Sequence, residues 1–143
     1  MARHFFFYGT LRPDLAQGLP ARLIERLEPV GGAVAYGRML ARRDPRGVYP
    51  VLVRGTGRVH GMVCRADGRL SGPWLDALDR YEGAAGGGGE YIRRPVAVRL
   101  AGGRRIMAQT YLFNRPLLPA LIPVPHGDFA RFLAETGLRS FAG

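Results

Sequence analysis

The feature that most constrains the fold is a pair of alternating segments in the second half of the chain. Residues 91–100 and 104–113 both alternate apolar with polar side chains, and Gly102 and Gly103 lie between them. Alternation with a period of two places every second side chain on one face of a sheet, and a glycine pair suits a tight turn. The sequence therefore predicts an antiparallel β-hairpin over residues 91–113.

The remaining segments predict more strands than helices. Further short strands are expected at residues 4–8, 34–40, 48–53 and 58–65. Helices are expected at 19–27, which Pro29 would end, at about 74–82, and from the N-cap Asp128 to Gly137. Residues 114–126 are rich in proline and predict an irregular arm.

Strands and helices do not alternate regularly along the chain. This order favours an α+β fold, in which a compact, partly closed β-sheet is covered by a few helices. A chain of 143 residues without repeats or a clear linker is expected to form one domain, residues 1–143.

Composition argues against several classes of function. All 21 basic residues are arginines, so no lysine can form a Schiff base, hold pyridoxal phosphate or serve a P-loop. The net charge is +10, but adjacent pairs occur only at Arg42-Arg43, Arg93-Arg94 and Arg104-Arg105. A nucleic-acid binder usually clusters its basic residues on one face. We therefore attribute the high arginine content to biased codon usage and expect no nucleic-acid partner.

The sequence also predicts no metal, cofactor or membrane partner. Cys64 is the single cysteine, and His4, His60 and His126 are scattered without the spacing of metal ligands. Residues 5–8 are the longest aromatic run near the N-terminus, too short for a secretion signal or a spanning helix. A cytoplasmic location is therefore expected.

Glu82 is the first candidate for chemistry. It follows Leu78 by four residues and Leu75 by seven, so the three side chains share one face of the predicted helix. Burial on that face, the negative end of the helix dipole and the nearby Asp79 would all raise the pKa of Glu82. A carboxylate tuned in this way suits a general base. The alternative is a surface glutamate at a frayed helix end, which helix geometry alone slightly favours.

Residues Tyr8, Gly9, Thr10 and Leu11 form the second candidate, directly after the predicted strand at 4–8. Glycine after a strand permits backbone conformations that other residues avoid, and successive N–H groups at such a bend can bind an anion. The hydroxyl of Thr10 adds a donor. The alternative is an ordinary turn that ends a strand.

Taken together, the motifs resemble the gamma-glutamylcyclotransferase-like family, especially its gamma-glutamylamine cyclotransferase and avirulence-induced-gene-like branch. The most specific blocks are Phe6–Arg12 and Leu75–Gly83. Weaker blocks follow in the expected order at Gly37–Leu40, Tyr49-Pro50, Val59–Gly61, Tyr91–Arg94, Ala108–Tyr111 and Gly127–Phe129. The resemblance covers nearly the whole chain.

The resemblance implies a small mixed β-barrel with flanking helices and a cofactor-free reaction. In that family, the backbone matching Tyr8 to Leu11 holds the substrate's α-carboxylate, and the carboxylate matching Glu82 is the catalytic acid and base. The reaction converts a γ-glutamyl compound into 5-oxoproline and a free amine or amino acid. Tyr91 is a further candidate for the pocket wall, although a strand tyrosine often only packs in the core.

Two departures from the family pattern bear on substrate choice. Gly83 to Gly89 is longer and richer in glycine than usual, which suggests a lid or, as we favour, a tolerated surface expansion. Met62 stands where relatives often have an acidic or polar residue, and Cys64 stands where they often have an aromatic one. A non-catalytic binding or regulatory module on the same fold is the alternative function.

Overall fold

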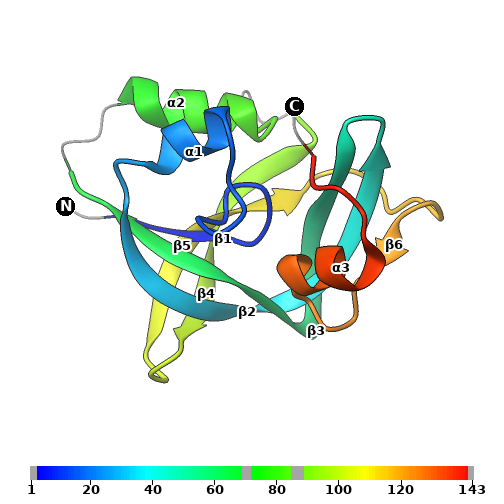
Figure 1. Ribbon diagram of the computed structural model, residues 1–143. Coiled ribbons are helices and arrows are strands. Elements are labelled where there is room, and N and C mark those ends of the chain that lie inside the picture. The colour runs from blue at the N-terminus through cyan, green and yellow to red at the C-terminus, as the bar shows by residue number, and fades with distance from the viewer. Residues whose placement is uncertain (1–2, 69–71, 85–88, 142–143) are drawn as a thin grey trace.

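Five strands close into a barrel in the computed structural model (Figure 1), which describes residues 3–68, 72–84 and 89–141. The strands are β1 (Arg3–Phe7), β2 (Glu28–Asp44), β3 (Gly47–Ala66), β4 (Tyr91–Leu100) and β5 (Arg105–Phe113). They follow the order β3-β1-β5-β4-β2, and a further pairing of β2 with β3 closes the ring. Among these five strands as the structure describes them, only β1 and β5 pair in parallel, so the barrel is mixed, as predicted.

The longest strands, β2 and β3, form one hairpin, where the sequence pattern predicts several shorter strands. The predicted strands at 34–40, 48–53 and 58–65 all lie within it. Register shifts at Pro29/Gly31 and Tyr36/Arg38 interrupt the pairing. Such irregularities bend strands, which allows 17- and 20-residue strands to curve around a small barrel.

The predicted hairpin at 91–113 is confirmed. β4 and β5 pair antiparallel from Tyr91 opposite Phe113 to Arg99 opposite Arg105. Gly103 has a φ of 92°, a conformation that glycine adopts without strain, so the turn requires the glycine that marks it. The arm at 114–126 is mostly irregular, but it contributes β6 (Ile122–Pro123), which pairs with β2.

Three helices pack on the barrel (Figure 1): α1 (Leu19–Ile24), α2 (Gly72–Tyr81) and α3 (Phe129–Thr136). α3 is capped as predicted, because Asp128 accepts a hydrogen bond from the N–H of Arg131 and Gly137 is left-handed. The prediction for α1 was too long, since the helix ends at Ile24 and Pro29 lies within β2. No helix in the described part of the chain is long and apolar enough to cross a bilayer.

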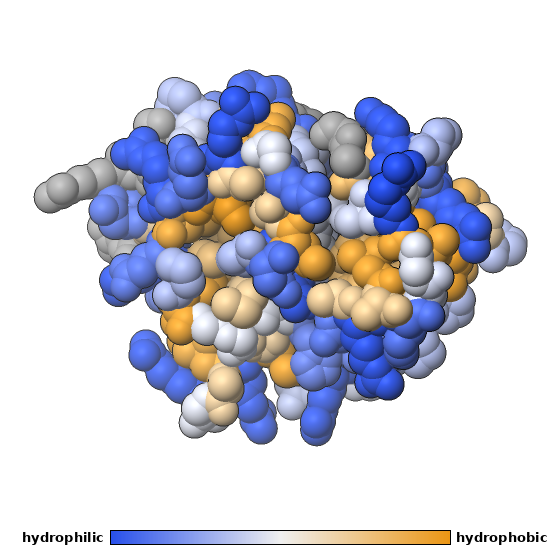
Figure 2. Space-filling view, viewed as in Figure 1, coloured by the Kyte–Doolittle hydropathy of each residue, from blue (hydrophilic) through white to orange (hydrophobic). Residues whose placement is uncertain are grey.

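The side chains of β1 separate two apolar cores. Phe6 belongs to a cluster that includes Phe129 of α3, whereas Phe5 belongs to a second cluster that includes Leu78 of α2. Because both faces of β1 are covered, the segment that follows it is held firmly on two sides. In the view of Figure 2, hydrophilic side chains surround an apolar band and do not gather into one block.

Candidate active site

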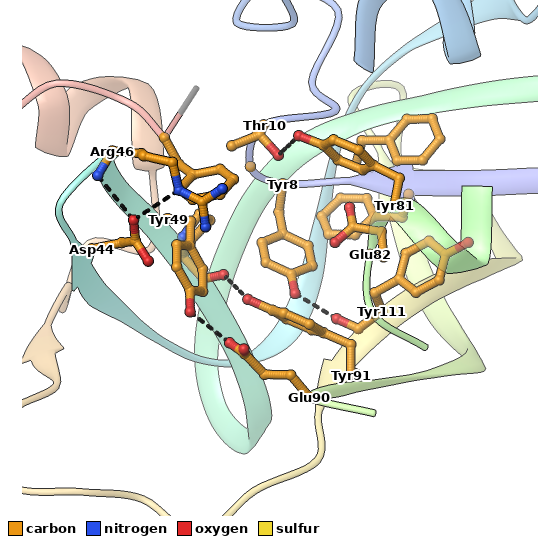
Figure 3. Close-up of a pocket in the computed structure, with 16 residues that line it drawn as sticks. Tyr8, Thr10, Asp44, Arg46, Tyr49, Tyr81, Glu82, Glu90, Tyr91 and Tyr111 are labelled. Atoms are coloured by element: carbon orange, nitrogen blue, oxygen red, sulfur yellow. Dashed lines mark hydrogen bonds and ion pairs between the residues drawn. The ribbon is translucent and has the colours of Figure 1, made fainter. Parts of the chain in front are cut away.

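A cavity of about 240 Å³ opens where the segment after β1, the end of α2, the start of β4 and the turn between β2 and β3 meet (Figure 3). Its walls carry mainly aromatic side chains and a few charged ones. The lining residues are Phe6, Phe7, Tyr8, Gly9, Thr10, Asp44, Arg46, Tyr49, Pro50, Tyr81, Glu82, Gly83, Glu90, Tyr91, Tyr111 and Phe141. A cavity of this size and character suits part of a small molecule.

The end of α2 positions Glu82. The N–H of Glu82 still donates to the carbonyl of Leu78, 3.1 Å away, so its backbone continues the helix by one residue. Gly83 follows with a φ of 67°, and the N–H of Ala84 donates to the carbonyl of Asp79 at 2.8 Å. This is a Schellman ending, which requires glycine at the left-handed position and fixes the backbone that carries Glu82.

The Glu82 side chain is directed into the cavity (Figure 3) and keeps only partial contact with solvent. Within the described residues, its carboxylate forms no hydrogen bond or ion pair. Burial is the main cause that raises the pKa of Glu82 from 4.5 to about 8, and the negative charge of Glu90 adds to it. The carboxyl group therefore changes its charge near neutral pH.

The predicted influence of Asp79 on Glu82 is wrong. Asp79 accepts hydrogen bonds from Nε of Arg93 at 2.9 Å and from the hydroxyl of Tyr111 at 2.6 Å. These partners come from β4 and β5, so helix spacing gave no sign of them. The carboxylate that raises the pKa of Glu82 is Glu90, directly before β4.

The segment from Gly9 to Leu11 presents unused backbone donors. Among the described residues, the N–H groups of Gly9, Thr10 and Leu11 donate no hydrogen bond, while the N–H of Arg12 closes a turn onto the carbonyl of Gly9 at 2.8 Å. The Arg12 side chain binds Asp128 at 3.0 Å, which ties the turn to the N-terminus of α3. Three free donors at a fixed turn can bind an anion.

Gly9 is required for close packing and not, as predicted, for its backbone conformation. Gly9 has no positive φ, so its backbone conformation does not demand glycine. Instead, a Cβ at this position would lie 2.5 Å from Cγ of Pro50. Gly9 is required because Pro50 approaches it closely.

Leu11 differs from the other predicted site residues. Tyr8, Gly9, Thr10, Glu82 and Tyr91 all line the cavity, whereas the Leu11 side chain is buried in the core beside α2. Any contact of Leu11 with a ligand would therefore be through its backbone. Neither Met62 nor Cys64 lines the cavity, so these departures from the family pattern make no contact there.

Three tyrosines form fixed walls around Glu82. The Tyr8 hydroxyl donates to the carbonyl of Tyr111, and the Tyr91 hydroxyl donates to the carbonyl of Pro50 at 2.8 Å. The Tyr81 hydroxyl donates to Oγ1 of Thr10 at 3.1 Å. Burial raises the pKa of all three phenols, so they remain protonated donors at neutral pH.

Sequence reasoning missed several residues of the cavity wall. Asp44 is the last residue of β2 and Arg46 lies in the turn that follows it (Figure 3). Phe141 comes from the C-terminal segment. Glu90 accepts a hydrogen bond from the Tyr49 hydroxyl at 2.8 Å. No local pattern distinguishes these residues, because only the folded chain brings them to the cavity. Residues 85–88 lie outside the described residues, so the lid hypothesis is not tested.

The arrangement favours acid–base chemistry on a small anionic ligand. Unused N–H groups at Gly9 and Thr10 and the unpaired Glu82 carboxylate border the same cavity. A ligand with a carboxylate and a nearby ammonium group would match both features. Within the described residues, no group of three or more histidine, cysteine or acidic side chains could hold a metal ion.

Comparison with known proteins identifies the family and the fold. The model of the family described as "Gamma-glutamyl cyclotransferase, AIG2-like" matches residues 5–131. A comparison with curated protein sequences gives no match.

Several solved structures share the fold at low sequence identity. YkqA from Bacillus subtilis is 19% identical with a TM-score of 0.67, and the alignment covers 96% of this chain but only 43% of YkqA. A structure named gamma-glutamyl cyclotransferase is 19% identical with a TM-score of 0.61, and the alignment covers 87% of this chain and 73% of that one. An AIG2-like protein from Mus musculus is 19% identical with a TM-score of 0.62, and the alignment covers 82% and 80% of the two chains.

Proposed function

Since this chain belongs to the gamma-glutamyl cyclotransferase, AIG2-like family, we propose that it converts a γ-glutamyl compound into 5-oxoproline and a free amine or amino acid. The observation that carries this proposal is an unpaired carboxylate, Glu82, beside free backbone donors in one cavity. The family assignment supports the reaction class, and the geometry supports the roles of the residues.

In the proposed complex, the N–H groups of Gly9, Thr10 and Leu11 bind the substrate's α-carboxylate. The adjacent α-ammonium group then faces Glu82, whose carboxylate has no protein partner within the described residues. Binding of the ammonium group replaces the missing partner and favours the ionised form of Glu82. Tyr8 and Tyr91 restrict the glutamyl chain to a folded conformation.

The reaction joins the substrate's own amine to its γ-carbonyl carbon. Glu82 takes one proton from the α-ammonium group, the amine attacks the γ-carbonyl carbon, and the bond from that carbon to the leaving nitrogen breaks. The proton on Glu82 passes to the leaving nitrogen. The second proton lost from the ammonium nitrogen leaves with the product amine, which is an ammonium ion near neutral pH.

This mechanism requires little catalytic machinery, and we propose that it needs no cofactor. Formation of a five-membered lactam is intramolecular, and effective molarities for well-oriented reactions reach about 10⁵–10⁸ M. Proton transfer by one positioned carboxyl group contributes about 10²–10⁴-fold. A cavity that folds the glutamyl chain and presents Glu82 therefore accounts for both contributions.

A panel of γ-glutamyl amines, amino acids and peptides tests the proposal. Formation of 5-oxoproline in amounts equal to the released amine is the expected result, measured by chromatography of both products. A non-catalytic binding module on the same fold is the second candidate, favoured by the tyrosine-walled cavity itself. Saturable binding of a γ-glutamyl compound without product would support that candidate and would contradict catalysis.

A further inference from the structure

Arg46 lies on the side of the cavity opposite Glu82 (Figure 3). Its guanidinium group stacks on the ring of Phe141. The guanidinium carbon of Arg46 lies 4.8 Å from the centre of the Phe141 ring. The Phe141 ring in turn meets Tyr49 edge to face, with 5.4 Å between ring centres. In the proposed complex the glutamyl unit occupies the Glu82 side, so this wall faces the leaving amine.

The C-terminal segment is held rigidly against the turn that carries Arg46. The N–H of Val48 donates to the carbonyl of Arg139, and the N–H of Phe141 donates to the carbonyl of Val48, both at 2.8 Å. Gly47 packs so closely that a Cβ there would lie 2.5 Å from the carbonyl oxygen of Ser140. The family model matches residues 5–131, so Phe141 lies outside the part of the chain that the model covers.

The acidic residues near this wall already have protein partners. Asp44 accepts from the backbone N–H of Arg46 at 2.9 Å and from its Nε at 3.2 Å. Glu90 accepts from Tyr49 and lies 3.3 Å from Nη1 of Arg42. Unlike Glu82, both carboxylates therefore already have protein partners.

Arg46 still has donors to offer. Its only bonds to other described residues are those to Asp44, which use the backbone N–H and Nε and leave both Nη groups unused. The Arg46 side chain is 63% exposed, so these groups are open to a ligand. A planar guanidinium with two free Nη groups suits a carboxylate.

We propose that Arg46 and Phe141 form the subsite for the leaving amine, and that Arg46 selects leaving amines that carry a carboxylate. The inference rests on the proposed cyclotransferase function. Phe141 and Asp44 fix the guanidinium by stacking and hydrogen bonding, and its Nη groups bind the carboxylate of the substrate's second half. Arg46 is remote from the reacting atoms, so it should affect KM more than kcat.

Matched substrates test the charge preference. The γ-glutamyl conjugates of glycine, β-alanine and γ-aminobutyrate are each compared with the corresponding primary amide, which keeps the shape and removes the charge. The conjugate of trimethylenediamine supplies a cation in the same place. For at least one acid–amide pair, we expect kcat/KM to favour the acid about 5- to 10-fold, the range of an accessible charged contact.

Variants assign the preference to Arg46. Arg46→Gln should reduce the acid-to-amide ratio to about one through KM, Arg46→Lys should restore part of it, and Phe141→Leu should weaken it by freeing the guanidinium. Arg43→Gln is the matched control, because Arg43 is an exposed arginine of the same hairpin that does not line the cavity. This control should keep the wild-type ratio.

The outcomes separate this inference from the proposed function. If 5-oxoproline forms but no acid is preferred, if the cationic conjugate is preferred, or if the preference survives in Arg46→Gln, the subsite assignment is wrong and the reaction class stands. If no conjugate yields 5-oxoproline under any condition, the proposed function fails and the subsite assignment fails with it.

Discussion

The buried carboxyl group of Glu82 should make the stability of the protein depend on pH. An unfolded chain releases the Glu82 proton near the ordinary pKa of 4.5, whereas the folded protein retains it until about pH 8. Between these two values the unfolded state binds fewer protons, so the free energy of unfolding falls as pH rises. Glu82→Gln removes the titrating group and should remove this loss.

The structure sets the size of the effect. The interval from 4.5 to about 8 corresponds to an upper limit of about 5 kcal/mol, at roughly 1.4 kcal/mol for each pH unit. Glu82 keeps partial contact with solvent through the cavity, which lowers the expected value to about 2–3 kcal/mol. Glu82→Gln should therefore gain this much stability over wild type as pH rises from about 4.5 to about 9.

Urea unfolding of both proteins, followed by the fluorescence of the single tryptophan Trp74, measures the difference at each pH. All other titratable groups are the same in the two proteins, so their contributions cancel in the difference between the two free energies of unfolding. Glu25→Gln, a change at an exposed carboxylate after α1, controls for the loss of an acidic residue. A difference between Glu82→Gln and wild type that stays constant across this range would refute the argument that Glu82 is buried without a partner.

Three further substitutions test the surroundings of Glu82. Glu90→Gln removes a neighbouring negative charge, so the acidic limb of the pH profile of kcat/KM should move to lower pH; an unmoved limb would show that Glu90 does not influence Glu82. Gly83→Ala places a Cβ at a φ of 67° and should lower the free energy of unfolding by about 1–2 kcal/mol and reduce kcat. Thermal unfolding and steady-state kinetics measure both effects, and a stable, fully active variant would contradict the Schellman assignment. Gly9→Ala places a Cβ 2.5 Å from Cγ of Pro50 and should raise KM by displacing the backbone donors of Gly9 to Leu11, whereas an unchanged KM would argue against carboxylate binding there.

Local patterns predicted the elements whose causes are local. The alternation at 91–113 and its glycine turn predicted the β4–β5 hairpin, and Asp128 and Gly137 predicted the ends of α3. Barrel closure depends on pairing of β1 with β5 and of β2 with β3, between segments far apart in the chain. Periodicity contains no information on such pairs, so the general form of the barrel came from the family resemblance.

The same distinction applies to the site. Helix spacing placed Glu82 on an apolar face, and the structure directs its side chain into the cavity. Spacing also suggested that Asp79 acts on Glu82, because it could not show Arg93 arriving from β4 to pair with Asp79. Arg46 and Phe141 were missed for the same reason, since only tertiary packing brings the turn and the C-terminal segment to the cavity.

The most direct test of the central claim is product formation by wild type and Glu82→Gln from one active γ-glutamyl substrate. We expect equal amounts of 5-oxoproline and amine from wild type, and a kcat lower by at least about 10²-fold in Glu82→Gln. Glu90→Gln, which changes a second cavity carboxylate in the same way, should remain active. If folded Glu82→Gln forms 5-oxoproline at the wild-type rate, Glu82 does not transfer the proton and the proposed mechanism is wrong.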